Sequence, residues 1–162
     1  MAQKTEECKC LAAVRVRGTV SATAEVRETL KILHLTHTNH GILIDSRPDY
    51  KGMLQRVGNY VTWGEPTKET VAELLQKRGR SVGGKKLTDE FIQKAGYKSI
   101  DDLAEAIVAC KVAFQKLPDT QPTFKLHPPS KGYKGKTKKS YRAGGEAGNR
   151  GEAINELLKR MM

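Results

Sequence analysis

Residues 8–64 decide the fold, and they run CKCLAAVRVRGTVSATAEVRETLKILHLTHTNHGILIDSRPDYKGMLQRVGNYVTWG. Small and apolar side chains recur at every second position of residues 8–17, which predicts a strand. Because successive side chains of a strand point to opposite faces, Arg15 and Arg17 are expected on the face opposite the apolar one. Gly18 ends this strand.

The rest of this stretch alternates between helical and strand signals. Apolar residues at helical spacing in 22–33 follow the cap candidates Ser21 and Thr23. Residues 42–44 predict a short buried strand, a second helix opens at Pro48, and residues 60–63 predict a third strand. The order β-α-β-α-β suits a small sheet covered by two helices.

The middle and the end of the chain carry further helical signals. Thr67 precedes a predicted helix over 68–78 that Gly79 ends, and Ser99 with Asp102 fits a capping box. The other predicted elements are a short helix from Thr88 to Gly96, a strand in residues 123–126 and a helix with one apolar face over 154–161. Cys110 lies on the apolar face of the helix that follows Ser99 and is expected in the core.

Charge is concentrated in one segment. The 162 residues carry a formal net charge of +11, and residues 122–150 alone hold eight Lys or Arg against one Glu. This segment is rich in Gly, Pro and Lys, so its composition predicts an extended chain that RNA orders on binding. Its lysines, interleaved with Tyr133 and Tyr141, are typical of contact with a nucleic-acid backbone and with stacked bases.

Composition excludes several classes of protein. The chain has no apolar run of the length that spans a membrane, and the acidic residues near its start argue against a secretory signal. Its three cysteines cannot close a disulfide framework, which favours a reducing compartment. We therefore expect an intracellular protein without a membrane partner.

Motifs for catalysis and metal binding are weak. Residues 79–86 nearly fit the phosphate-binding loop G-x-x-x-x-G-K-[ST], but Lys86 occupies the hydroxyl position and the loop follows a helix instead of a strand. Cys8 and Cys10, with a histidine cluster at residues 34–40, have thiol and imidazole groups but not the spacing of a common zinc site. The sequence thus predicts no catalytic residues, no metal and no cofactor.

The chain resembles the L-thirty family of large-subunit ribosomal proteins, whose eukaryotic counterpart is L-seven. The resemblance is carried by Asn39-His40 before the second strand, by Tyr50-Lys51-Gly52-Met53 and by Trp63-Gly64-Glu65-Pro66. Residues 124–129 and 144–150 are similar to the longer archaeal and eukaryotic members, and the absence of a long basic N-terminal extension favours an archaeal one.

This resemblance implies an α+β fold: a ferredoxin-like β-α-β-α-β core with an added helical subdomain and a basic C-terminal tail ending in a helix. The expected units are the core domain 1–65, the helical extension 66–121, the basic extended RNA-binding tail 122–150 and the C-terminal helix 151–162. The family's RNA-facing regions fall on Arg15, Arg17, His37, Asn39, His40, Arg47 and Lys51. Charge and stacking groups in and beside the tail add Lys125, His127, Lys131, Tyr133, Lys134, Lys136, Lys138, Lys139, Tyr141, Arg142 and Arg150.

The implied function is structural: a constituent of the large ribosomal subunit, in the cytoplasm, that binds large-subunit ribosomal RNA and supports translation. Neighbouring large-subunit proteins are expected partners, and the small RNA of that subunit is a further candidate. The alternative is a non-ribosomal basic module that binds RNA or protein. An enzyme ranks last, because the sequence offers no convergent set of titratable groups.

Overall fold

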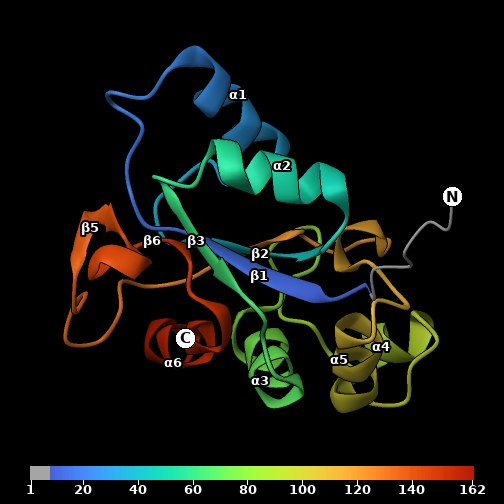
Figure 1. Ribbon diagram of the computed structural model, residues 1–162. Coiled ribbons are helices and arrows are strands. Elements are labelled where there is room, and N and C mark those ends of the chain that lie inside the picture. Colours follow the sequence, from blue (N-terminus) through green and yellow to red (C-terminus); the bar gives the residue numbers. More distant parts are fainter. Residues whose placement is uncertain (1–7) are drawn as a thin grey trace, which may run out of the picture.

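One six-stranded sheet with helices on both faces organises the computed structural model, which describes residues 8–162 (Figure 1). The elements along the chain are β1 (Cys10–Arg15), α1 (Ala24–Ile32), β2 (His40–Asp45), α2 (Pro48–Arg56), β3 (Val61–Gly64), α3 (Lys68–Arg78), α4 (Asp89–Lys94), α5 (Ile100–Val108), η1 (Phe114–Lys116), β4 (Thr123–Lys125), β5 (Lys136–Ser140), η2 (Tyr141–Ala143), β6 (Gly145–Asn149), η3 (Gly151–Ala153) and α6 (Ile154–Met161). The predicted β-α-β-α-β order of the first 65 residues is confirmed.

The sheet has the strand order β4-β2-β1-β3-β6-β5. The central strand β1 is antiparallel to both β2 and β3, with Val14 opposite Gly41 on one side and opposite Thr62 on the other. On the outer side, β6 runs parallel to β3 and β5 runs parallel to β6. The fold is the expected ferredoxin-like α+β core, extended at both edges by strands from the last quarter of the chain.

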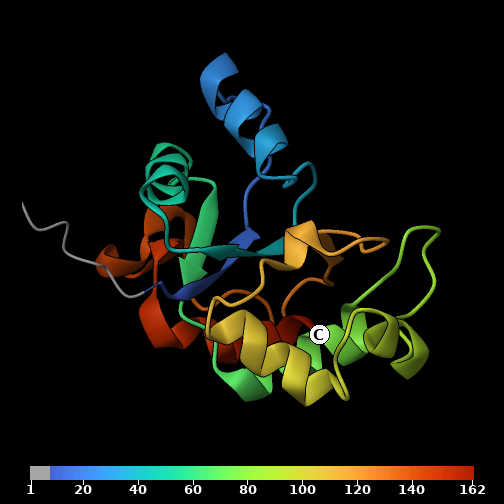
Figure 2. The same cartoon turned by 90° about the vertical axis from the view of Figure 1, so that its right-hand side faces the viewer.

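Two helical layers enclose the sheet (Figures 1 and 2). Helices α1 and α2 cover one face, and α3, α5 and α6 cover the other. Side chains of β1 alternate between two apolar clusters, with Leu11 and Ala13 in one and Ala12 and Val14 in the other. The expectation of one polar face on this strand was wrong: every residue of β1 is buried, because both faces are covered.

The helical layer confirms its predicted caps. The Thr67 hydroxyl accepts a hydrogen bond from the Thr70 amide, and the Ser99 hydroxyl accepts one from the Asp102 amide at 3.2 Å. Gly79 ends α3 for a steric reason, since its φ of −61° suits any residue but a Cβ there would lie 2.3 Å from the Leu75 carbonyl oxygen.

The basic segment 122–150 differs from the extended tail that its composition predicts. It supplies β4, β5 and β6 to the sheet, and Phe124 is buried against Phe114 with the ring centroids 5.0 Å apart. The chain then returns through α6, whose apolar face packs in the same cluster as α3 and α5. The segment is part of the folded domain because its backbone pairs with strands of the core, and amino-acid composition carries no information on such pairing.

Candidate nucleic-acid interface

The sheet topology gathers most predicted RNA-facing residues at one end. Because β1 is antiparallel to its neighbours, its last residues meet the first residues of β2 and β3. Pairing of His40 with Lys125, and of Lys136 with Gly145, brings the ends of β4 and β5 to the same side. We call this the basic end of the sheet, marked by Arg17, His37, His40, Lys125 and Lys136.

The turn before β2 is fixed by backbone and side-chain hydrogen bonds. Asn39 has the left-handed φ of 64°, and its amide donates to the Arg15 carbonyl at 2.8 Å. Its side-chain oxygen accepts a hydrogen bond from the Tyr133 hydroxyl at 3.1 Å, so the turn is joined to the basic segment. Asn39 and Tyr133 therefore stabilise the interface through a contact within the protein.

His37 and His40 lie together on this turn, with ring centroids 5.0 Å apart. Burial lowers the pKa of His40, and the neighbouring His37, Lys125 and Arg15 lower it further. A neutral imidazole stacks on a base or accepts a hydrogen bond, but it adds no charge for a phosphate.

Arg15 is a correction to the sequence prediction. It is 4% exposed, and its guanidinium donates to the carbonyl oxygens of Arg17, Leu35 and Thr36. Because these donors are bound to backbone carbonyl oxygens, Arg15 stabilises the basic end and does not offer its guanidinium to RNA. The alternating pattern of the strand did not predict this burial, because it placed Arg15 on the face opposite the apolar one, which was expected to be exposed.

Arg150 and His127 also make their contacts within the protein. The Arg150 side chain is 7% exposed, forms an ion pair with Glu146 and lies over the Tyr141 ring, 4.9 Å from its centroid. Both ring nitrogens of His127 lie within hydrogen-bond distance of carbonyl oxygens, those of Pro128 and Met162. These two predicted contacts secure the outer strands and the end of the chain.

Exposed cations remain at the basic end and along β5. The half-buried Arg17 lies over the Tyr60 ring, 5.1 Å from its centroid, and the exposed Lys134 pairs with Glu156 at 2.5 Å. The exposed basic residues of the segment are Lys125, Lys131, Lys134, Lys136, Lys138, Lys139 and Arg142. Glu146, the segment's one acid, is buried against Arg150, so it does not offset them.

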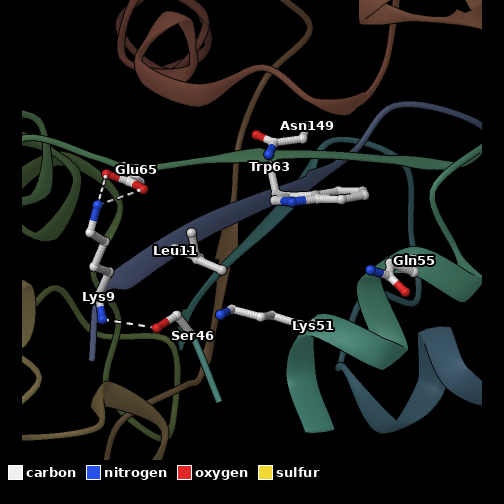
Figure 3. A pocket seen from close by; sticks show the side chains of 8 residues that line it. All are labelled: Lys9, Leu11, Ser46, Lys51, Gln55, Trp63, Glu65 and Asn149. Atoms are coloured by element: carbon white, nitrogen blue, oxygen red, sulfur yellow. Dashed lines mark hydrogen bonds and ion pairs between the residues drawn. The ribbon is translucent and has the colours of Figure 1, made fainter. Parts of the chain in front are cut away.

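Arg47 and Lys51 are not brought to this end. Lys51 lines an open hollow of about 540 Å³ between the sheet and α2 (Figure 3), and Arg47 pairs with Asp45 where β1 begins. In the hollow, the half-buried Trp63 ring lies near Lys51, and the Lys9 ammonium bonds to Glu65. Sequence reasoning did not assign Trp63 or Lys9 to a site, although a lone tryptophan on a short strand was the available signal.

Gly79–Lys86 forms a hairpin that bridges Arg80 to Lys86, with positive φ at Gly83 and Gly84. It follows α3, so it does not present the strand–loop–helix geometry that cradles phosphates. Lys85 and Lys86 are exposed and were not among the predicted RNA contacts.

The residues weighed for zinc are separated. His34, His37 and His40 lie towards the basic end, whereas Cys8 and Cys10 lie at the other end of β1. In residues 8–162, the one group of potential metal ligands that gathers is Cys8, Asp45 and Cys110. Among the helices of that range, none combines the length and the apolar composition that a bilayer crossing needs.

Comparisons of the sequence with known families and with individual proteins point to one family. The sequence family described as Ribosomal protein L30p/L7e matches residues 11–61. A protein of Archaeoglobus fulgidus named Large ribosomal subunit protein uL30 is 46% identical over 151 residues, covering 93% of this chain and 98% of its own. Proteins of the same name from Staphylothermus marinus and Thermofilum pendens are 45% and 43% identical, covering 93% and 92% of this chain and 97% and 96% of their own.

Proposed function

The chain belongs to the Ribosomal protein L30p/L7e family, and from that premise we propose that it is a structural constituent of the large ribosomal subunit, in the cytoplasm, that binds the subunit's RNA. Its family is one of ribosomal proteins, and its role in translation is to stabilise the particle. The partners we propose are large-subunit ribosomal RNA and the neighbouring large-subunit proteins.

One observation carries the RNA-binding proposal: the seven exposed basic residues of segment 122–150 stand on a folded backbone, while the segment's one acid is buried in an internal ion pair. Lysines held in this way neutralise phosphates and release counterions. They add affinity and orientation without reading bases.

The proposed contact set is narrower than the sequence alone predicts. The phosphate contacts are Arg17, Lys125, Lys131, Lys134, Lys136, Lys138, Lys139 and Arg142, with His37, His40 and Tyr141 as stacking groups. A second, smaller contact is formed by Lys51, which lines the hollow beside Trp63, and by Arg47, which pairs with Asp45 at the same end of the sheet. A protein with contacts at both ends of one sheet can bridge two RNA segments.

Sedimentation tests this proposal. A cell extract is separated on a sucrose gradient at low and at moderate salt, and the protein is traced by mass spectrometry. We expect stoichiometric recovery in the large-subunit peak at both salts. Recovery only in the light fractions would overturn the ribosomal assignment and leave a free basic module that binds RNA or protein.

A further inference from the structure

Three potential metal ligands from distant parts of the chain meet at the end of the sheet opposite the basic end. The thiols of Cys8 and Cys110 and the carboxylate of Asp45 have ligand atoms within 4.8 Å of one another. None of the three is among the proposed RNA contacts, and the sequence did not indicate the grouping, because Cys110 is 102 positions from Cys8.

Backbone contacts fix two of the three positions. Cys8 lies just before β1, where Lys9 and Ser46 exchange hydrogen bonds, the Lys9 amide donating to the Ser46 hydroxyl and the Ser46 amide to the Lys9 carbonyl. Asp45 ends β2 directly opposite Cys10. Pairing of β1 with β2 thus fixes the backbone at Asp45 and directly after Cys8.

Cys110 is placed by the end of α5. Its amide donates to the Ile107 carbonyl at 3.0 Å, and its φ of 54° turns the chain back. A left-handed conformation is uncommon for a residue other than Gly, Asn or Asp. The expectation of a core position is only partly met, since Cys110 is partly exposed and packs at the margin of the cluster.

The donor set has the chemistry of a zinc site. Two thiolates and a carboxylate are ligands that Zn²⁺ accepts, with Zn–S bonds of about 2.3 Å and tetrahedral geometry. That geometry separates two sulfurs by about 3.8 Å, so ligand atoms within 4.8 Å need to move by about 1 Å or less. One oxygen of Asp45 pairs with Arg47 at 3.1 Å, which leaves the other for a metal. Cys8 is exposed, so the fourth position opens to water.

Burial and the neighbouring groups keep the thiols of this site protonated when no cation is bound. The pKa of Cys110 is raised to about 12, chiefly by burial and then by Cys8 and Asp45, while Arg47 opposes them. Burial likewise raises the pKa of the adjacent Cys10 to about 12. Without a metal these thiols are protonated, and a divalent cation that binds must displace the protons.

We propose that Cys8, Asp45 and Cys110 form a binding site for a divalent cation of borderline softness, with Zn²⁺ as the best match and water as the fourth ligand. The bound ion joins the start of β1, the end of β2 and the turn after α5. It therefore stabilises the contact between the sheet and the α3–α5 layer.

The test uses the full chain, reduced and freed of metal, with Co²⁺ as a spectroscopic probe. We expect one Co²⁺ per chain, a thiolate-to-cobalt charge-transfer band, visible bands of tetrahedral intensity, and loss of all three when Zn²⁺ is added. Zn²⁺ should also raise the melting temperature, and affinity should rise with pH as protons leave the thiols.

Variants separate this site from its surroundings. Cys8→Ser changes an exposed side chain, so the fold should persist while Co²⁺ affinity falls at least tenfold, and Cys110→Ser and Asp45→Asn should act in the same direction. Cys10→Ala is the matched control, a neighbouring thiol outside the group, and it should keep the cobalt spectrum. Absence of a thiolate band, or a spectrum that survives Cys8→Ser and Cys110→Ser, overturns the proposal. A reduced protein that takes up no Co²⁺ but forms a Cys8–Cys110 disulfide in air, with the loss of two hydrogens, overturns it as well.

Discussion

The inner strands β1, β2 and β3 and the outer strands β5 and β6 belong to one continuous array, yet different forces hold them. Inner strands are buried on both faces by apolar side chains, as in β1, where every residue is buried. By contrast, β5 has the sequence KTKKS and is almost wholly exposed. A strand can therefore be fixed without a hydrophobic face, provided that its backbone is paired with a neighbouring strand and that other residues attach this pair to the core.

The anchor of the outer strands is polar and depends on close backbone approach. Glu146 accepts hydrogen bonds from the Gly135 amide and from Arg150, and Arg150 also donates to the Thr62 hydroxyl of β3. A Cβ at Gly145 would lie 2.1 Å from the Lys139 carbonyl oxygen, so only glycine allows this packing. The lysines are thereby presented on an ordered backbone.

The largest expected effect on stability comes from the apolar attachment of the basic segment. Phe124 is 1% exposed and stacks on Phe114, so Phe124→Ala should lower the free energy of unfolding by about 3–5 kcal/mol. Tyr141→Ala is the matched control, because Tyr141 is 40% exposed on the same segment and should cost far less. Urea unfolding followed by circular dichroism measures both. Equal losses would mean that the segment is not anchored through the core.

Breaking the polar anchor should have the next largest effect. Glu146→Gln leaves the buried Arg150 without its charge partner, which should cost roughly 3 kcal/mol. Protection from amide hydrogen exchange should fall in β6 while β1 and β2 stay protected. Glu156→Gln removes the exposed pair with Lys134 and should change nothing measurable. Uniform loss of protection across the sheet would show that inner and outer strands unfold as one unit.

The same contrast explains what the sequence could and could not predict. Apolar periodicity, together with caps such as Thr67 and Ser99, located the core strands and helices because burial and capping leave local patterns. Composition failed for residues 122–150, where order comes from partners distant in sequence, such as Thr62 and Gly41. For the site, charge predicted the exposed lysines, but neither charge nor the family resemblance could set apart Arg150 and Arg15, whose roles depend on acceptors inside the protein.

A smaller effect on stability should come from the turn that joins the inner strands to the basic segment. The pKa of His40 is lowered in the folded protein, chiefly by burial, so the unfolded chain takes up this proton first as pH falls. Stability from this group is complete above the unfolded pKa of about 6.5 and is lost as pH falls through the folded value. Melting temperatures between pH 7.5 and 5 should decline less steeply in His40→Gln than in the unchanged protein. An equal decline in the two proteins would mean that His40 does not contribute to this pH dependence.

The smallest effect on stability, and the one most specific to function, should come from the lysines of β5. Replacing Lys136, Lys138 and Lys139 together by Ala should leave the free energy of unfolding within about 0.5 kcal/mol, because β5 is held by backbone pairing. Affinity for large-subunit RNA should nevertheless fall, and the slope of log affinity against log salt should become shallower by about 0.7–0.9 for each phosphate that is no longer neutralised. The matched control replaces Lys94, Lys98 and Lys111, three exposed lysines on the helical layer, and should keep the original slope. If the two triple variants change the slope equally, binding depends on net charge alone. A change confined to the β5 variant means that RNA binding depends on where the outer strands place their charges.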